Sequence, residues 1–235
     1  MRKIPTSHNG LFYTNILSDL SRNRNFQRYM EIGVATGQTF SCIFCDTGIA
    51  VDPAFNIQHN IMQGKKRVSL FQMESDTFFR DIDVIKEFGG PVDFAFLDGM
   101  HRYEYLLRDF HNAEKICAPQ SLIAMHDCLP LNAVMAHRDQ ATAVELGRNT
   151  PYQNYWTGDV WKIIPILKKY RPDLKLILTH TPPTGLVFVS NLNPESMVLS
   201  DNYDQIVQEF NAVPNDLDAI AALYTENRIT GSATY

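Results

Sequence analysis

The fold is decided by the stretch Arg28-Tyr-Met-Glu-Ile-Gly-Val-Ala-Thr-Gly37, in which a short apolar run leads into two glycines. The run predicts a β-strand over 28–34, and the residues from Gly37 to Cys45 are typical of a following helix. Glycine at such a turn permits a sharp bend and a close approach of the main chain to a ligand. In open α/β sheets, ligands bind at this end of the strand. The stretch therefore predicts both the start of an α/β sheet and a ligand site.

The same alternation of short β-rich runs and longer helical segments continues along the chain. It predicts a doubly wound, mostly parallel, Rossmann-like seven-stranded α/β sheet with helices on both faces. We expect one domain over 1–235, a core at about 28–190, and a lid or insertion at 132–155. Further strands are expected at 48–52, 67–72, 92–97, 121–126, 174–178 and 186–190. Helices are expected at 74–88, 102–117 and 161–170, and from about Tyr203 and Leu217 onward.

The composition narrows the classes of partner. The chain has 235 residues, 20% of them charged, and a net charge of −5, which gives no general attraction to nucleic acid or to an anionic membrane. No apolar run approaches the roughly 20 residues that span a bilayer, and the N-terminus lacks the apolar core of a signal peptide. We expect a cytoplasmic protein that acts on a small molecule, without nucleic acid or membrane partners. The oligomeric state stays open, with a homo-oligomer among the alternatives.

An acidic residue, Asp52, ends the second expected strand, 19 residues after Gly33. A carboxylate in this position can accept hydrogen bonds from both hydroxyls of a ribose. The dinucleotide fingerprint G-x-G-x-x-G is not met, because Ala35 and Gln38 stand where it requires glycine. Glu31 and Asp98 add negative charge, which suits a cationic nucleoside better than a diphosphate. S-adenosylmethionine carries a sulfonium and an ammonium group, so charge complementarity favours it over NAD.

Motifs in the chain resemble a known family. The pattern Glu31-x-Gly-x-x-x-Gly37, followed by the strand-terminal Asp52, looks like motifs I and II of class I S-adenosylmethionine-dependent methyltransferases. Three segments are similar to the methyltransferase 24 type, a branch that contains small-molecule and sugar O-methyltransferases. They are Phe96-Leu-Asp-Gly-Met-His-Arg-Tyr-Glu104, Met125-His-Asp127 and Gly158-Asp-Val-Trp161. The resemblance covers about residues 28 to 190. Ala35 departs from it, since many members have a further glycine there.

The resemblance implies a role for each matching residue. The loop from Glu31 to Gly37, including Gly33 and Ala35, would wrap the methionine part of the cofactor, and Asp52 would hold the ribose. Glu74 and Ser75 would lie at the adenine, although acidic and hydroxyl residues are also favoured at a plain helix N-terminus. Asp98 would sit beside the methionine part or a metal.

Two carboxylates and two histidines follow the fourth and fifth expected strands: Asp98, His101, His126 and Asp127. Neighbouring strands lie about 4.8 Å apart, so these residues can converge on one small volume. Asp98, His126 and Asp127 are candidate ligands of a divalent cation such as Mg²⁺, although imidazole is a poor magnesium ligand. Without a metal, His101 or His126 could remove the proton of an acceptor hydroxyl. The catalytic candidates are therefore Asp98, His101 and His126.

These features predict an S-adenosylmethionine-dependent methyltransferase that O-methylates a small hydroxylated molecule. Two alternatives remain open. An NAD-type oxidoreductase is disfavoured by the missing glycines and the acidic surroundings. A nonenzymatic nucleoside-binding module with the same fold is not excluded, because fold alone does not determine activity.

Overall fold

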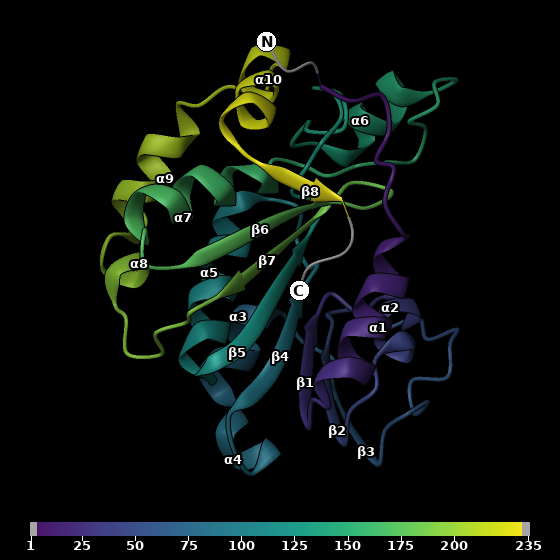
Figure 1. Cartoon of the computed structure of the whole chain (residues 1–235), viewed down its shortest axis with the longest axis vertical. Helices are drawn as coiled ribbons and strands as arrows, with labels where there is room; N and C mark the ends of the chain where they lie inside the picture. The colour runs from purple at the N-terminus through teal and green to yellow at the C-terminus, as the bar shows by residue number, and fades with distance from the viewer. Residues whose placement is uncertain (1–3, 232–235) are drawn as a thin grey trace.

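The computed structural model describes residues 4–231 and contains one eight-stranded sheet in the order β3-β2-β1-β4-β5-β7-β6-β8 (Figure 1). Strands β3, β2, β1, β4 and β5 pair in parallel, whereas β7 runs antiparallel to both β5 and β6. The predicted doubly wound α/β fold is thereby confirmed. The strands are β1 Arg28–Ile32, β2 Thr47–Val51, β3 Arg67–Phe71, β4 Val92–Leu97, β5 Cys117–His126, β6 Lys175–His180, β7 Leu186–Ser190 and β8 Ile229–Gly231.

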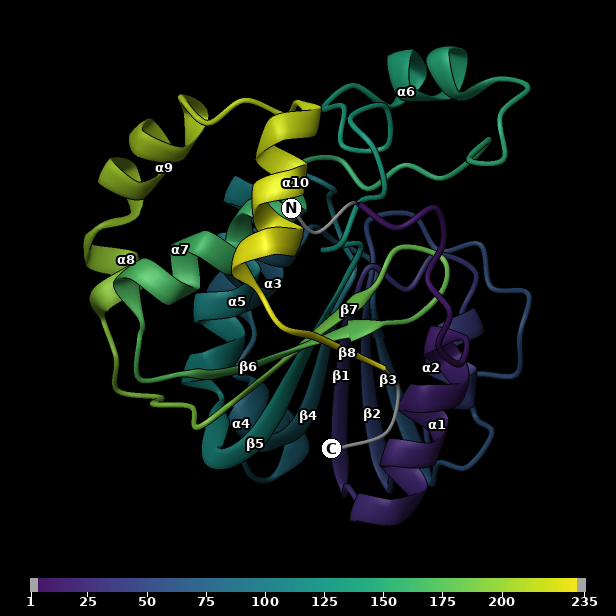
Figure 2. The same cartoon turned by 45° about the horizontal axis from the view of Figure 1, so that its top comes forward.

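Helices cover both faces of this sheet. Helices α1 and α2 lie on one face, at the right in Figure 2, and α3, α4, α5 and α7 lie on the other. The helices are α1 Tyr13–Arg24, α2 Gln38–Cys42, α3 Ser75–Asp81, α4 Val84–Phe88, α5 Tyr103–Lys115, α6 Gln140–Gly147, α7 Ile163–Tyr170, α8 Val198–Asp201, α9 Tyr203–Asn211 and α10 Leu217–Glu226, with a 3₁₀ turn at Val160–Lys162.

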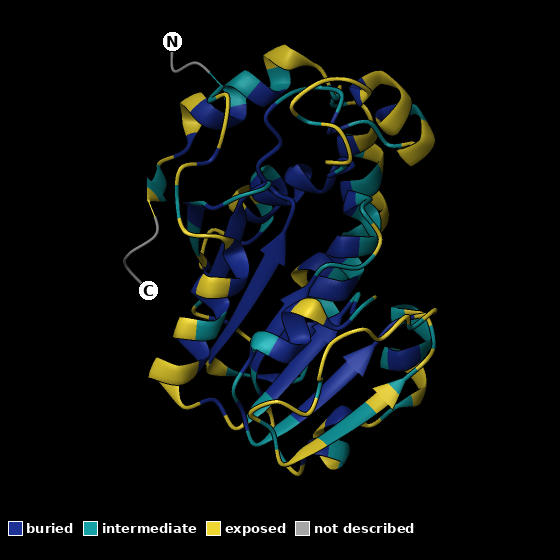
Figure 3. Cartoon of the chain, turned by 90° about the vertical axis from the view of Figure 1, so that its right-hand side faces the viewer, coloured by how far each residue is buried: buried dark blue, intermediate teal, exposed yellow. Residues whose placement is uncertain are grey.

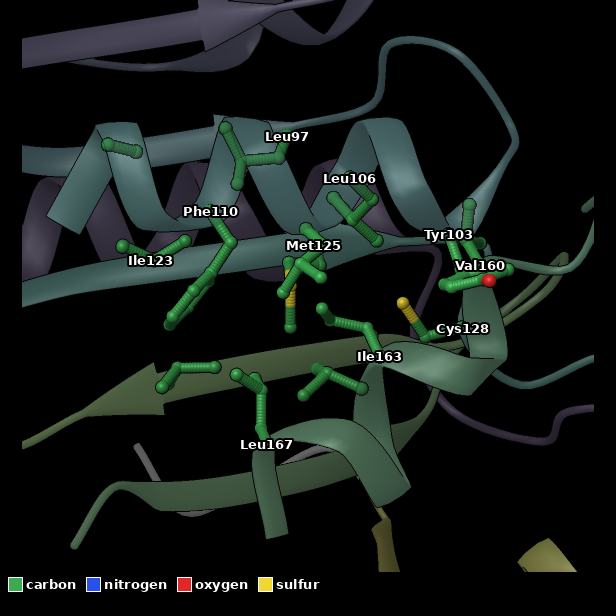
Figure 4. Packing of buried hydrophobic residues seen from close by; sticks show 14 of the residues in the cluster. Leu97, Tyr103, Leu106, Phe110, Ile123, Met125, Cys128, Val160, Ile163 and Leu167 are labelled. Carbon is green, nitrogen blue, oxygen red and sulfur yellow. The ribbon is translucent and has the colours of Figure 1, made fainter. Parts of the chain in front are cut away.

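The central strands are buried on both faces, as Figure 3 shows. Along β4, Phe94 and Phe96 point into the core under α1 and α2, whereas Ala95 and Leu97 point into the opposite core. This alternation follows from the two-residue period of a strand. On the second face α5 and α7 pack over β4 and β5, with Phe110 and the neighbouring side chains filling the space (Figure 4). Burial on both faces holds the carboxyl ends of the strands in a fixed arrangement.

Several expected elements need correction. The prediction of seven strands was wrong by one, because β8 adds to the edge of β6. The expected helix over 74–88 is two helices, because Asp83 accepts a hydrogen bond from the Lys86 N–H (3.0 Å) and so caps a new helix. Strand β5 begins at Cys117, four residues earlier than expected. Helix α1 was not expected at all.

The segment 132–155 follows β5 and lies beyond the carboxyl ends of the parallel strands, with α6 at its centre (Figure 1). The Tyr152 hydroxyl donates a hydrogen bond to the Thr6 carbonyl oxygen (3.0 Å), which ties this segment to the chain before α1. Across residues 4–231, none of the helices combines the length and the apolar character needed to cross a membrane.

Candidate active site

The tips of β1 and β4 are in main-chain contact. The Asp98 N–H donates to the Ile32 carbonyl oxygen (2.9 Å), which continues the ladder past the end of β4. A Cβ atom added to Gly33 would lie only 2.0 Å from the Asp98 carbonyl oxygen, and Gly33 has a φ of +85°. Only glycine satisfies both conditions. The first glycine of the motif therefore sets Asp98 directly beside the turn after β1.

A cavity of about 540 Å³ opens at these strand ends. Its volume is in the usual range of small-molecule sites. Its walls come from the ends of β1, β2 and β4, from the start of α3 and from the loop before α5. The lining residues are Ile32, Gly33, Ala35, Val51, Asp52, Pro53, Met73, Glu74, Ser75, Asp76, Asp98, Gly99, Met100, His101 and Tyr105. Seven of the residues singled out from the sequence therefore share one cavity.

Asp52 is buried at the end of β2 and organises the glycine-containing turn. Its Oδ2 atom accepts a hydrogen bond from the Ala35 N–H (2.8 Å), and its Oδ1 atom accepts one from the Ala54 N–H (2.7 Å). Ala35 has a φ of +46°, the left-handed region in which glycine is favoured. The bond from Asp52 helps to hold Ala35 in this conformation. A carboxylate offers about four acceptor positions, so acceptor capacity remains for a ligand.

Two of the loop residues predicted to bind the cofactor, Glu31 and Gly37, lie outside the cavity wall. Glu31 is buried, and the Tyr29 hydroxyl donates a hydrogen bond to its Oε2 atom (2.5 Å). Burial raises the pKa of Glu31 well above its ordinary value, although the Tyr29 hydrogen bond opposes this. Gly37 stands at the start of α2, with its N–H bonded to the Val34 carbonyl oxygen (2.8 Å). Both residues therefore belong to the loop but do not line the cavity.

The cavity wall is acidic. Asp52, Glu74 and Asp98 contribute carboxylates, while Asp76 is already paired with Arg108 (2.8 Å). Among the described residues that form the wall there is no lysine or arginine. Glu74 precedes α3 but makes no side-chain capping hydrogen bond to the described chain, so helix capping does not account for it. This charge distribution favours a cationic ligand over an anionic one.

Asp98, His101, His126 and Asp127 form one cluster at the ends of β4 and β5. His101 Nε2 lies 3.3 Å from Asp127 Oδ2 and 3.7 Å from Asp98 Oδ1. His126 Nδ1 lies 3.3 Å from one oxygen of each aspartate. Thr184 donates a further hydrogen bond to Asp127 Oδ1. The two strand tips therefore converge as the sequence predicts.

The charges in this cluster are coupled. Burial lowers the pKa of His101, but the charge of Asp127 and the hydrogen bond to Asp98 outweigh burial and raise this pKa to about 9. Burial also lowers the pKa of His126, and the two aspartates again prevail, so its pKa lies well above the ordinary value. Burial acts to raise the pKa of Asp98, but His126 and His101 hold it well below the ordinary range. Before any ligand binds, both imidazoles are thus favoured as cations.

The two histidines differ in their surroundings. His101 lines the cavity, and its Nδ1 faces the Trp156 carbonyl oxygen at 2.8 Å, so Nδ1 carries a proton and donates it. His126 is not part of the cavity wall, and its ring packs against Tyr13, with ring centroids 4.2 Å apart. Within residues 4–231 its buried Nε2 finds no hydrogen-bond partner. Of the two, His101 has the access that a base needs.

A metal-ligand geometry is present, with one change from the expected set. Single donor atoms of Asp98, His101 and Asp127 all lie within 4.8 Å of one another. The sequence pointed to His126 in place of His101. His126 Nδ1 instead faces the two carboxylates at hydrogen-bonding distance, which leaves His101 as the histidine available to a cation.

Three residues of the cluster were missed from the sequence. Tyr13 covers His126, Trp156 holds His101, and Thr184 bonds Asp127. The spacing of Tyr13, Ile16, Leu17 and Leu20 could have shown an amphipathic helix before β1. The other two contacts join residues more than fifty positions apart, for which a single sequence carries no local signal.

This arrangement of strand tips, glycine-containing turn and acidic cavity defines a protein with the class I methyltransferase fold. The family model described as a methyltransferase domain, of the methyltransferase 24 type, matches residues 7–128, just over half of the chain. The protein belongs to this methyltransferase family, which confirms the resemblance to class I S-adenosylmethionine-dependent methyltransferases. No curated protein matches the sequence.

Solved structures with a similar fold agree with this assignment. Cofactor-bound Rv0187 from MTB superposes with a TM-score of 0.52 at 14% identity, over 81% of this chain and 84% of that one. The O-methyltransferase TomG from Streptomyces achromogenes, in complex with SAM, gives 0.50 at 15% identity over 77% and 80%. The O-methyltransferase from Bacillus cereus, in complex with SAH, gives 0.50 at 13% identity over 80% and 84%. At these identities the likeness concerns the fold.

Proposed function

We propose that this methyltransferase uses S-adenosylmethionine to O-methylate a small hydroxylated molecule. The observation that carries the proposal is the acidic cavity bounded by Gly33, Asp52 and Asp98, with His101 on its wall. Its volume and its charge suit a cationic nucleoside. Two O-methyltransferases of similar fold are in complex with S-adenosylmethionine and with its demethylated product. A diphosphate, as in NAD, would meet the carboxylates of Asp52, Glu74 and Asp98, with no lysine or arginine among the described residues of the wall.

Different residues would hold the ribose, the adenine and the methionine part of the cofactor. We assign the ribose hydroxyls to the free acceptor positions of Asp52, and the adenine to the wall formed by Met73, Glu74 and Ser75. Asp98, together with the turn at Gly33 and Ala35, would face the methionine part. Glu31 and Gly37 support that turn without lining the cavity. When bound, S-adenosylmethionine supplies a methyl group on a cationic sulfur.

His101 is the proposed general base. Its Nδ1–H donates to the Trp156 carbonyl oxygen, so in the neutral ring the lone pair is on Nε2, the atom that faces Asp98 and Asp127. Nε2 would take the proton of the acceptor hydroxyl as the oxygen bonds to the methyl carbon and the carbon–sulfur electron pair returns to sulfur. The two aspartates would stabilise the imidazolium that forms. A cationic cofactor held beside Asp98 would add positive charge and so would lower the pKa of His101 from about 9 toward neutrality.

The same cluster also fits a divalent cation. Asp98, His101 and Asp127 would hold it, and imidazole with two carboxylates suits Mn²⁺ or Zn²⁺ better than Mg²⁺. A cation there would lower the pKa of an acceptor hydroxyl. His101 cannot ligate a cation and act as base at once. Turnover that survives a chelator therefore supports His101 as the base, whereas turnover that is lost and restored by Mn²⁺ supports the metal.

The proposed function is tested by incubating the protein with S-adenosylmethionine and a library of sugars, phenols and other small alcohols. Mass spectrometry then measures the demethylated cofactor and the methylated acceptor. We expect acceptor-dependent product that is absent in Asp52→Ala. Cofactor binding without transfer to any acceptor would favour a nonenzymatic binding module.

A further inference from the structure

The side chain of Trp156 lies flat against His101. The two ring centroids are 4.7 Å apart with an interplanar angle of 25°, and the Trp156 carbonyl oxygen faces His101 Nδ1 at 2.8 Å. The same residue therefore contacts both the face and one edge of the imidazole. Trp156 is half-buried and is absent from the cavity wall, so its link to this cavity is through His101, which lines it.

The main chain after Trp156 is also pressed against His101. Gly158 has a φ of +55°, and a Cβ atom added there would lie 1.7 Å from the His101 carbonyl oxygen. A side chain at position 158 would push the two segments apart. His101 is thus held by segment 156–158 through its ring and through its backbone.

This segment joins the two ends of the stretch 132–155. The Trp156 indole N–H donates to the His137 carbonyl oxygen (2.7 Å), and the Thr157 N–H donates to the Met135 carbonyl oxygen (2.9 Å). Next to this junction, Arg138, which follows His137, pairs with Asp159 (2.5 Å), two residues after Thr157. Asp159 in turn accepts a hydrogen bond from the Tyr103 N–H (3.2 Å) at the start of α5, two residues after His101.

Trp161, the second tryptophan, has a different environment. It is buried in the core, 3% exposed, and its indole N–H donates to Asn215 Oδ1 (3.1 Å). Core packing accounts for Trp161. It does not account for Trp156, whose hydrogen-bonding groups are both directed at the junction between His101 and the stretch 132–155.

We propose that Trp156 is a positioning residue for His101, which fixes the tautomer and plane of the imidazole and makes both depend on the folded stretch 132–155. The carbonyl oxygen selects the Nδ1–H tautomer, the indole ring fixes the plane, and the indole N–H links this orientation to His137. The inference rests on the proposed role of His101 as base, but the position of the ring can be measured without turnover.

The test compares Trp156→Ala, Trp156→Phe and the buried control Trp161→Phe. Nitrogen-15 NMR of the histidine rings, recorded at a pH above the His101 pKa of about 9 so that the ring is neutral, reports the tautomer of His101, assigned by its loss in His101→Ala. The Trp156 carbonyl oxygen remains in every variant, so the variants test whether the indole ring holds it at His101 Nδ1. We expect Trp156→Ala to shift the two His101 ring nitrogens toward a mixture of tautomers, and Trp156→Phe, which keeps a flat ring, to restore most of the native pattern. Trp161→Phe should leave the His101 signals unchanged. Native His101 signals in a folded Trp156→Ala protein would overturn the proposal.

Turnover separates this inference from the proposed function. With an acceptor found in the library, Trp156→Ala should lower kcat by about tenfold or more, because a misoriented base loses most of its contribution. The dissociation constant for S-adenosylmethionine should stay within about twofold of the wild-type value. If His101→Ala keeps full turnover, the base assignment fails, while the nitrogen shifts still decide whether Trp156 positions the ring.

A second measurement covers the case in which Trp156→Ala does not fold. In the Trp161→Phe background, Trp156 is the sole tryptophan, because the sequence contains two. Its fluorescence should rise when His101→Ala removes the stacked imidazole, a quencher of indole emission. Unchanged fluorescence would mean that the two rings are not in contact in solution, and the proposal would fail.

Discussion

Gly33 and Asp98 touch through their main chains, with only 2.0 Å between the Asp98 carbonyl oxygen and the place where a Cβ of residue 33 would lie. This contact sets the first wall of the cavity beside the carboxylate of Asp98. The next strand tip, at Asp52, is fixed to the same turn through the Ala35 N–H. The acidic cavity thus follows from how closely three strand ends approach one another.

Gly33→Ala tests this close approach. We expect it to destabilise the fold by about 2 kcal/mol more than Gly89→Ala, because overpacking adds to the cost of a positive φ. Gly89 is the matched control, since its φ is +71° and a Cβ there meets no described atom within 4 Å. Urea unfolding of both variants gives the difference. Equal losses of stability would mean that the β1 and β4 tips are not in contact.

Asp52→Asn tests the proposed contact between Asp52 and the ribose of the cofactor. We expect the dissociation constant for S-adenosylmethionine to rise about tenfold to a hundredfold, because hydrogen bonds to a charged group contribute about 1.5–3 kcal/mol. Asp93→Asn is the control, since Asp93 also accepts two backbone N–H bonds, from Gln27 and Arg28, but does not line the cavity. Calorimetry should find native affinity in the control. Similar losses in both variants would point to a general structural effect.

His101→Ala tests the proposed base. Loss of a general base typically costs about a hundredfold to ten-thousandfold in rate, so kcat should fall in this range with little change in cofactor affinity. The exposed His59 provides the control, and His59→Ala should keep wild-type kcat. A steady-state assay with an accepted alcohol and saturating cofactor measures kcat. Native rates in His101→Ala would remove this residue from the chemistry.

The pH dependence of the free energy of unfolding should reveal the raised pKa of Asp109, which is buried in α5 close to Gly99. Burial raises the pKa of Asp109 to about 7 in the folded protein, against the hydrogen bond from Ser75 that lowers it. Between the unfolded pKa near 3.8 and about 7, the unfolded state has lost this proton and the folded state keeps it. The contribution of Asp109 is therefore fully present below the unfolded pKa and is lost as the pH rises toward 7.

Urea unfolding of wild type and Asp109→Asn across this range measures the effect. The free energy of unfolding of the wild type should decline relative to the variant by up to about 1.4 kcal/mol per pH unit. Parallel curves for the two proteins would show that Asp109 ionises normally in the folded state.

Much of the fold was predictable because its strands are short apolar runs separated by turn residues. The runs at Met30, Ile49 and Phe94 lie at the strand positions expected from the sequence. The expected helix at 74–88 failed, because nothing in its periodicity marks Asp83 as a second cap. Strand β8 is three residues long and is defined by pairing with β6, a long-range contact that no local pattern contains.

In the site, too, the locally encoded residues were predictable and the long-range contacts were not. Asp52 and Asp98 were predictable as strand-terminal acids, since parallel strands bring such residues to one edge. The choice between His101 and His126 was not predictable. It depends on Trp156, which is 55 residues from His101 in the chain, and on Tyr13 of α1, which covers His126 and is 113 residues from it in the chain.

The most direct test of the central claim is isothermal titration calorimetry of the purified protein at pH 7 with S-adenosylmethionine and, separately, with NAD⁺. The acidic cavity predicts saturable one-to-one binding of S-adenosylmethionine that Asp52→Asn weakens and Asp93→Asn does not, and no binding of NAD⁺. Binding of NAD⁺ in the absence of any binding of S-adenosylmethionine would contradict the account.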